Sequence, residues 1–472
     1  MRSAFAGKTT KPYLVLVSMG ITYSSVVAAP IDAVFEWHER RGALVRLLPP
    51  WQPLRVIRES DSVRDGMAVL ALPGRARIVA RHDYRRYQRP TRFSDMITSF
   101  PLQGHWKHEH AFSAQTPDTT RLTDKVDAPV PARLLQPMFT YRHRQLAHDL
   151  NAHSWASTLQ PEPLTVALAG ASGMIGTSLA AFLTTGGHRV IRLVRHASRG
   201  MNERRWDPHS PRLDLLDGVD AVIHLAGAPI AKRFTAEHRR AVADSRVGPT
   251  RELAKCAAHS QVATFISASA VGFYGPDRGD EQLYESSPVG DGFLADVVAR
   301  WEEATQPARA EGVRTVQVRT GIVQTPRGGF LQLQRPLFMA GGGGKLGSGD
   351  EWLPWIGLDD LLDVYLRALV DPALVGPVNA VAPNPVRTGQ YAATLGRVMR
   401  RPALIPVPGF GPRLLLGAKG AREVVETSQY VVPDVLERRG HKFRYERLED
   451  ALRHELGKEK PVSGSEELNT GQ

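Results

Sequence analysis

A glycine-rich turn between a buried strand and a helix constrains this chain more than any other segment. The run LTVALAGASGMIG covers residues 164–176, and its apolar first half leads into Gly170, Gly173 and Gly176. Glycine lets such a turn tighten and lets the backbone approach a pyrophosphate, whose charge meets the free N–H groups of the helix. SLAAFLTTGG and HRVIRLVR follow as the helix, with its glycine stop, and a second strand. The pattern predicts a dinucleotide site rather than an ordinary strand–turn–helix.

The end of the second predicted strand indicates which dinucleotide binds. NAD sites place Asp or Glu about 20 residues after the glycines, where it binds the ribose 2′-hydroxyl. Here the strand ends in Leu193, Val194, Arg195 and His196, with no acid beside them. Because a guanidinium grips a 2′-phosphate through paired hydrogen bonds, Arg195 predicts NADP(H), with Ser172 as a second contact. The alternative is an ordinary surface arginine in an arginine-rich chain.

Composition bounds the remaining possibilities. With 472 residues the chain is too long for one compact core, so two or three domains are expected. Its apolar content of 42% and charged content of 23% are typical of soluble globular proteins, and we expect a cytoplasmic one. The net charge of +12 comes from scattered arginines without a basic block, which weighs against nucleic-acid binding. The single cysteine, Cys256, excludes internal disulfides and cysteine-based metal cages.

The N-terminus loosely resembles a signal peptide, because residues 13–29 are apolar, follow lysines and end in small residues. Ser, Thr and Tyr interrupt this stretch, and ITYSSVV alternates like a strand, so we expect a first strand there. Met19 is a candidate start, which would make residues 1–18 an extension. No segment is long enough to span a membrane, and the sequence indicates no oligomeric state.

Residues 19–155 read as a separate α+β domain. A strand, a short helix opened by Pro30 and several strand-like runs precede a long amphipathic segment that begins at residue 131. This order resembles the helix-grip fold of the START/Bet v 1-like superfamily. The resemblance has no sharp motif, and it implies an apolar cavity under the last helix that binds a hydrophobic ligand or supports a protein interaction. A proline-containing linker is expected at 151–163.

Three histidines of this domain, His105, His108 and His110, raise a metal hypothesis. On a strand, His108 and His110 would share one face while His105 points away. No second cluster nearby supplies further ligands, so we favour histidines that line the cavity or the strand surface. We therefore expect no metal.

Strands and helices alternate over residues 164–385, which predicts a doubly wound parallel α/β sheet with right-handed crossovers. A smaller C-terminal lobe on the substrate side is expected at 386–456, and a disordered polar tail at 457–472. The predicted strands are 165–170, 189–194, 220–225, 263–268, 314–319 and about 377–381.

Three segments carry the resemblance to a known family. Each is a predicted strand that ends in small or hydroxyl side chains, at the edge where ligands of such sheets bind. They are DAVIHLAG at 220–227, FISASAVGFYG at 265–275 and VRTGIV at 318–323. With the glycine turn, they resemble an extended short-chain dehydrogenase/reductase, close to the nucleoside-diphosphate-sugar epimerases and dehydratases. The resemblance implies a Rossmann-type sheet with a small C-terminal lobe. The predicted cofactor-binding residues are Gly170, Ser172, Gly173, Met174, Ile175, Gly176, Arg195, Leu225, Ala226 and Gly227.

Finer marks resemble one atypical branch, the epimerase family proteins of unsettled substrate, some of which carry a fused helix-grip domain in front. These marks cover the central and C-terminal parts densely. They are Trp206-Asp207-Pro208, Leu225 to Ile230, Ser245-Arg246 with Thr250, Trp301-Glu302, Gly341 to Gly349, Trp355-Ile356, Asp359-Asp360 and Ala382 to Pro385.

The chain departs from the superfamily at the catalytic pair. Members use a Ser or Thr together with a Tyr and, four residues later on the next helix, a Lys that lowers the tyrosine pKa from about 10. Ser269 fits the serine. The two helix places hold Phe293 or Leu294, and Val297 or Val298, and none of these side chains moves a proton.

Two functions follow from this departure. In the first, Tyr274 replaces the missing acid/base, with Arg319 or another cation lowering its pKa, and Ser269 binds the reacting oxygen of a small carbonyl or nucleotide-sugar substrate. The chain is then an NADP(H)-dependent epimerase or oxidoreductase. In the second, the chain binds NADP(H) without fast turnover, as a sensor or scaffold coupled to a hydrophobic-ligand-binding front domain. Tyr274 is then a packing aromatic.

Overall fold

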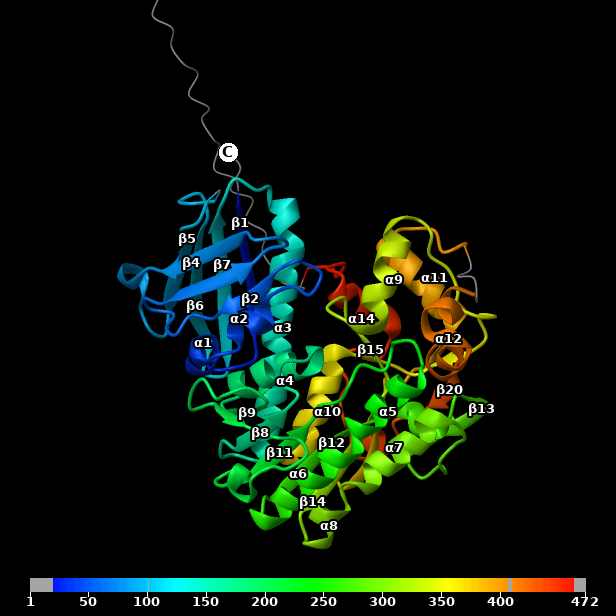
Figure 1. The fold of residues 1–472 in the computed structure, drawn as a ribbon. Coiled ribbons are helices and arrows are strands. Elements are labelled where there is room, and N and C mark those ends of the chain that lie inside the picture. Colours follow the sequence, from blue (N-terminus) through cyan, green and yellow to red (C-terminus); the bar gives the residue numbers. More distant parts are fainter. Residues whose placement is uncertain (1–19, 101, 406–409, 462–472) are drawn as a thin grey trace, which may run out of the picture.

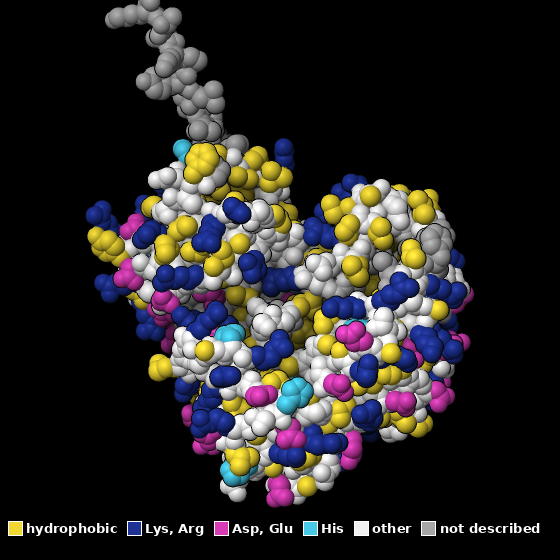
Figure 2. Space-filling model, viewed as in Figure 1, with side chains coloured by type: hydrophobic (Ala, Val, Ile, Leu, Met, Phe, Trp, Pro, Cys, Tyr) yellow, Lys and Arg dark blue, Asp and Glu magenta, His cyan; other side chains and the backbone are white. Residues whose placement is uncertain are grey.

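Three parts follow one another in the computed structural model, which describes residues 20–100, 102–405 and 410–461. Figure 1 shows an antiparallel front domain in blue and cyan, a parallel central sheet in green, and an orange and red C-terminal lobe. Residues 13–19 of the signal-like segment, Met19 included, and residues 462–472 lie outside the described residues. Within those ranges, no helix has both the length and the apolarity needed to cross a bilayer. On the face in Figure 2, basic side chains are scattered among acidic and apolar ones.

The front domain is a seven-stranded sheet of order β1-β7-β6-β5-β4-β3-β2 in which all neighbours are antiparallel. Burial alternates along β6 and β7, so one face of the sheet packs on the core. The predicted strand, the Pro30-opened helix and the long closing helix are confirmed. The elements are β1 (Gly20–Val27), α1 (Ile31–Glu39), α2 (Ala43–Leu47), β2 (Arg55–Arg58), β3 (Met67–Ala71), β4 (Arg77–His82), β5 (Arg92–Ile97), β6 (Lys107–Thr116), β7 (Thr119–Asp127) and α3 (Ala132–Leu159).

The linker expected at 151–163 is wrong for its first nine positions, because α3 continues as a helix to Leu159. Ala156 is buried in the core of the central domain, and Trp155 packs against the same core. The Arg367 guanidinium lies 4.4 Å from the centre of the Trp155 ring. These contacts with residues far along the chain stabilise a last helical segment that local sequence did not indicate.

The central sheet has the order β10-β9-β8-β11-β12-β14-β18, and every neighbouring pair is parallel. The chain turns from one side of β8 to the other between β10 and β11, which is where doubly wound sheets bind ligands. The six predicted strands are confirmed to within two residues, and the three-residue β10 was not predicted. The strands are β8 (Thr165–Ala169), β9 (Arg189–Val194), β10 (Glu203–Arg205), β11 (Ala221–His224), β12 (Thr264–Ala270), β14 (Arg314–Thr320) and β18 (Gly376–Ala380).

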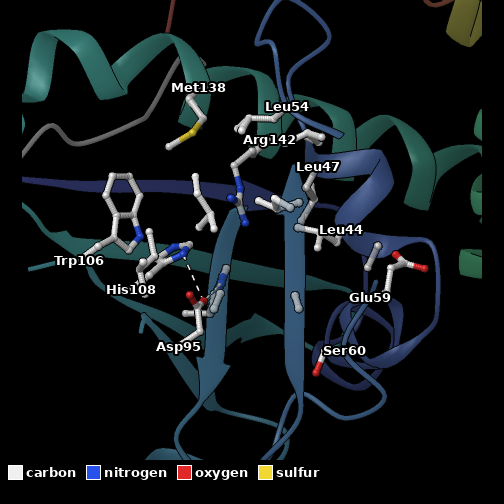
Figure 3. A pocket seen from close by; sticks show the side chains of 18 of the residues that line it. Leu44, Leu47, Leu54, Glu59, Ser60, Asp95, Trp106, His108, Met138 and Arg142 are labelled. Carbon is white, nitrogen blue, oxygen red and sulfur yellow. Dashed lines mark ion pairs between the residues drawn. The ribbon is translucent and has the colours of Figure 1, made fainter. Parts of the chain in front are cut away.

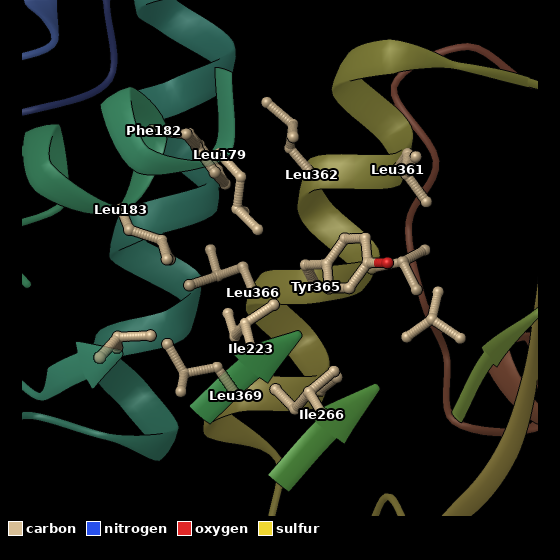
Figure 4. Packing of buried hydrophobic residues seen from close by; sticks show 14 of the residues in the cluster. Leu179, Phe182, Leu183, Ile223, Ile266, Leu361, Leu362, Tyr365, Leu366 and Leu369 are labelled. Carbon is tan, nitrogen blue, oxygen red and sulfur yellow. The ribbon is translucent and has the colours of Figure 1, made fainter. Parts of the chain in front are cut away.

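Helices cover both faces of this sheet. Figure 4 shows α4 and α10 side by side over β11 and β12, with Leu183, Leu366 and Ile223 among the residues that meet there. The α4 helix is apolar nearly all round because it lies between this sheet and the front domain. The helices are α4 (Met174–Thr185), α5 (Ala236–Asp244), α6 (Val247–His259), α7 (Phe293–Glu303), α8 (Gln306–Ala310), α9 (Gly329–Met339) and α10 (Leu358–Val370).

The C-terminal lobe has a core that also takes in residues from before 386, among them Leu331 and Trp355. The disorder predicted from 457 does not hold for its first residues, because Glu459 is bonded to Arg144 and lies 3.0 Å from His454 Nδ1. The elements of this region are β13 (Asp277–Leu283), β15 (Ile322–Gln324), β16 (Trp352–Leu353), β17 (Trp355–Gly357), β19 (Val386–Arg387), α11 (Thr388–Met399), α12 (Phe410–Val424), β20 (Ser428–Val431), α13 (Asp434–Arg438) and α14 (Leu448–Glu455).

A buried ion network joins the three parts. Asp149 on α3 accepts hydrogen bonds from Arg46 of α2 at 2.8 and 2.7 Å and from Arg444 at 2.9 Å. Arg46 also donates to Asp359 on α10 at 2.7 Å, and Arg444 to Asp363 at 2.6 Å. Since buried charges need partners, this network fixes how the front domain sits on the rest of the chain.

Candidate functional site

The glycines of the turn after β8 are required by the backbone itself. Gly170 has φ of +84°, and a β-carbon there would lie 2.8 Å from Ala226 N. A β-carbon at Gly176 would lie 2.2 Å from the Gly170 carbonyl oxygen. Gly173, which precedes α4, has much more room, with its nearest such contact at 3.3 Å. The first and third glycines therefore close the turn onto the helix and the neighbouring strand, while the second leaves space for a ligand.

Among the described residues, no side chain caps or neutralises the N-terminus of α4. Its first turn contains no acid. The free N–H groups and the positive end of the helix dipole therefore point out of the turn. This environment fits a phosphate.

A crevice of about 1130 Å³ opens beside this helix end, at the carboxyl ends of β8, β9 and β11. It brings together most of the predicted cofactor residues. Met174, Ile175 and Gly176 do not line it: Met174 lies against Gly328, and Ile175 packs on the central core. The predicted residues that do line it are Gly170, Ser172, Gly173, Arg195, Leu225, Ala226 and Gly227.

Basic side chains gather at the β9 end of the crevice. Arg195 is exposed there, and it forms no ion pair with any residue that the structure describes. His196 and His209 line the same end. Glu203 also lines the crevice, although its Oε2 accepts a hydrogen bond from the Arg199 backbone at 2.9 Å. Sequence reasoning missed Glu203, because only the pairing of the short β10 with β9 brings it near.

Two further residues hold the loop after β11. Ser245 Oγ accepts a hydrogen bond from Ala228 N at 2.9 Å, and Arg246 donates to the Ala228 carbonyl at 3.0 Å. A β-carbon at Gly227 would lie 2.9 Å from the Arg246 guanidinium carbon. The Ser245-Arg246 mark in the sequence therefore shapes the wall of the crevice, a role that its pattern alone did not indicate.

The two predicted catalytic residues meet in one buried network around Arg319, as the sequence suggested. Arg319 donates to both carboxylate oxygens of Glu302 at 2.8 Å and to the Tyr274 hydroxyl at 3.0 Å. Ser269 Oγ donates to Glu302 at 2.5 Å, and the Tyr274 hydroxyl to Asn379 Oδ1 at 2.7 Å. Every polar group named here thus has a protein partner.

The surroundings of Tyr274 favour the packing role over the acid/base role, the two roles that the sequence left open. Its side chain is fully buried. Its ring packs with Leu283, which follows closely in the chain, and with Val431, which lies much further along. Burial raises its pKa to about 12, despite the opposing effect of Arg319. The phenol therefore stays protonated near neutrality, and it does not line the crevice. Ser269 is likewise buried, and its hydroxyl is turned toward Glu302 of α7; it does not line the crevice either.

The first two turns of α7 present apolar side chains to the turn after β12. A β-carbon at Gly272 would lie 3.7 Å from Leu294 Cβ and 3.9 Å from Val298 Cγ2. Leu294 and Val298 are four residues apart, so they are the pair that faces the strand end, in the places left open by the sequence. Neither side chain exchanges a proton.

A second cavity, of about 530 Å³, lies between the front sheet and α3. Figure 3 shows apolar side chains around it, among them Leu44, Leu47 and Met138. The α2 helix supplies Leu44 and Leu47, and it also contacts α4. A β-carbon at Gly42 would lie 2.5 Å from the Ala181 carbonyl oxygen, so backbone meets backbone there. The α2 helix therefore lines the front cavity on one side and packs against α4, the helix that follows the glycine turn, on the other.

Comparisons with known proteins agree with this site. The NAD dependent epimerase/dehydratase family matches residues 166–380, and a domain of unknown function, DUF1731, matches 407–455. An epimerase family protein of Mycobacterium bovis is 40% identical over 290 residues, which are 61% of this chain and 96% of that protein.

Two solved structures are also similar. A nucleoside-diphosphate sugar epimerase from Corynebacterium glutamicum is 42% identical with a TM-score of 0.83, over 94% of this chain and 91% of that one. The human epimerase family protein SDR39U1, solved with NADPH, is 28% identical with a TM-score of 0.57, over 62% of this chain and 99% of that one. The Corynebacterium likeness thus extends over the front domain as well.

Proposed function

This chain belongs to the epimerase family of NAD-dependent epimerases and dehydratases, and we propose that its nicotinamide cofactor is NADP(H). The observation that carries the proposal is Arg195 at the β9 end of the crevice, which pairs with no acidic side chain in the part of the chain that the structure describes. The turn from Gly170 to Gly173 and the start of α4 would hold the pyrophosphate, and Arg195 with Ser172 the 2′-phosphate. When bound, the nicotinamide supplies or accepts a hydride. The human relative solved with NADPH supports this choice.

Calorimetric titration of the full chain with NADPH and NADH tests the assignment. A charge-assisted contact to the 2′-phosphate contributes about 1.5–3 kcal/mol, which corresponds to roughly 10- to 100-fold tighter binding of NADPH. Equal affinities for the two nucleotides would contradict NADP(H) as the cofactor.

We propose further that the chain binds this nucleotide without acid–base turnover by Ser269 and Tyr274. The sealed network around Arg319 and the apolar pair on α7 support this function. The second candidate is an epimerase or oxidoreductase that acts on a nucleotide sugar or small carbonyl. The name of the Corynebacterium relative, which this chain matches over 94% of its length, favours that candidate.

Tyr274→Phe and Ser269→Ala separate these two functions. We expect both variants to leave NADPH affinity unchanged and to leave any NADPH oxidation or UDP-glucose epimerisation at the wild-type background, because neither hydroxyl reaches the crevice. The measurements are NADPH absorbance and product analysis with UDP-glucose. Wild-type turnover that Tyr274→Phe abolishes would establish the catalytic candidate instead.

For the front domain we propose a helix-grip type whose cavity takes a hydrophobic ligand, linked to the nucleotide site through α2. The support is the apolar lining by Leu44 and Leu47 on the helix that also meets α4. Coupling between two binding sites is reciprocal. We therefore expect the apolar dye 1-anilinonaphthalene-8-sulfonate to bind with an affinity that saturating NADPH changes by several-fold. Identical dye titrations with and without NADPH would contradict the linkage.

A further inference from the structure

Four polar side chains lie across three neighbouring strands on the cavity face of the front sheet. His108 and His110 stand two residues apart on β6, so both point to this face, and both are almost completely buried. The register places Asp95 of β5 opposite His108 and Asp124 of β7 opposite His110. Figure 3 shows Asp95 and His108 facing each other at the cavity wall.

The donor atoms on the cavity side lie at the spacing of a metal-ion site. Asp95 Oδ2 is 3.6 Å from His108 Nδ1 and 4.0 Å from His110 Nε2. One donor atom from each of the three residues lies within 4.8 Å of the other two. A tetrahedral ion with bonds of about 2.1 Å holds its donors about 3.4 Å apart. The Asp95 oxygen would therefore need to shift only slightly toward the two ring nitrogens, without a change of rotamer.

The opposite ring nitrogens of both histidines turn toward one buried carboxylate. Asp124 Oδ1 lies 2.6 Å from His110 Nδ1 and 3.2 Å from His108 Nε2. Asp124 Oδ2 lies 3.0 Å from His143 Nε2, and the other nitrogen of that ring is 2.7 Å from Ser25 Oγ. Metal-binding histidines typically turn their second nitrogen to a carboxylate in this way, which orients the ring.

The contacts around Asp124 Oδ1 orient both imidazole rings. His108 Nε2, His110 Nδ1 and Asp124 Oδ1 contact one another and have no other polar partner among the described residues. Each histidine thus turns one nitrogen to Asp124 and the other toward Asp95, where an ion would bind.

We propose that Asp95, His108 and His110 bind a divalent first-row transition-metal ion at the wall of the front cavity. Two imidazoles and one carboxylate are the donor set of zinc and non-haem iron(II) sites that keep open positions. The remaining positions would face the cavity of about 530 Å³, which gives the ion a path of entry. The competing interpretation is that Arg142, which projects from α3 into the cavity, neutralises Asp95 and no ion binds (Figure 3).

Metal titration of the full chain, freed of metal by a chelator, distinguishes these interpretations. Co²⁺ and Zn²⁺ are added alone, and Fe²⁺ is added without oxygen; binding is followed by calorimetry and by the visible bands of Co²⁺. We expect one equivalent to bind. Asp95→Asn and His108→Ala should remove that equivalent and the bands, and Asp124→Asn should weaken binding about 10- to 100-fold. The three ions compared at equal concentration identify the preferred one.

His105→Ala is the matched control, because His105 is exposed in the turn before β6 and should leave the titration unchanged. Unchanged NADPH affinity in each variant shows that the rest of the molecule is intact. If His108→Ala fails to fold, Asp95→Asn, which preserves volume, decides the question. The proposal is overturned if the wild-type chain binds no ion saturably, or if His105→Ala loses as much binding as Asp95→Asn.

Discussion

Replacing Asp149 by Ala is expected to lower the free energy of unfolding by about 3–5 kcal/mol, the range for breaking a buried ion pair. The substitution removes three hydrogen bonds from the buried guanidinium groups of Arg46 and Arg444 and leaves both with fewer partners. Because Arg46 belongs to the front domain and Arg444 to the C-terminal part, the loss weakens the docking of both. Urea unfolding followed by circular dichroism measures it.

Two variants control this prediction. Asp61 pairs with Arg41 and Arg58 on the surface, so Asp61→Ala should leave the urea midpoint unchanged within error. Asp149→Asn keeps the shape of the side chain and some of its hydrogen bonds, and we expect a loss between those of the other two variants. A similar midpoint for Asp149→Ala and wild type would mean that the network does not stabilise domain docking.

Arg195→Glu should weaken NADPH binding by at least about 100-fold, because it removes the charge-assisted contact and adds a carboxylate that repels the 2′-phosphate. NADH should bind as well as before or better, since a carboxylate at this strand end can accept from the ribose 2′-hydroxyl. Calorimetric titration with both nucleotides measures the change in preference.

Arg199→Glu is the matched control for charge. Arg199 lies four residues further along and is not among the residues that line the crevice, so the same charge change should have little effect on NADPH affinity. Glu203 is the acid that lines this end among the described residues, and Glu203→Gln should also leave the preference for NADPH in place. If Arg195→Glu and Arg199→Glu lowered NADPH affinity equally, the loss would come from the change in net charge and not from a contact between Arg195 and the 2′-phosphate.

The local parts of the fold and site were predictable from sequence. The central strands are short apolar runs between glycines and polar turns, so their positions were readable to within two residues. The need for Gly170 and Gly176 follows from the shape of the turn. A β-carbon at Gly176 would strike the backbone of Gly170, and one at Gly170 would strike the backbone just after β11. Arg195 was found in the same way, from its place directly after β9.

What sequence could not supply was pairing between distant segments. The sequence left two roles open for Tyr274, because β20, more than 150 residues later, supplies Val431 to the cluster that buries it. Asp95 and Asp124 meet the histidines of β6 only through strand register, which no local pattern reveals. The last turns of α3 are stabilised by the packing of Trp155 against the core of the central domain, whose residues come later in the sequence.

The continuous α3 helix limits how this protein can be dissected. Its last two turns belong to the core of the central domain, while its first turns roof the cavity. A fragment that starts after the helix would lack the His153 ring and the Arg46 guanidinium, both of which now pack against Phe182 of α4. We therefore expect either half, expressed alone, to expose part of this apolar contact surface, which favours aggregation.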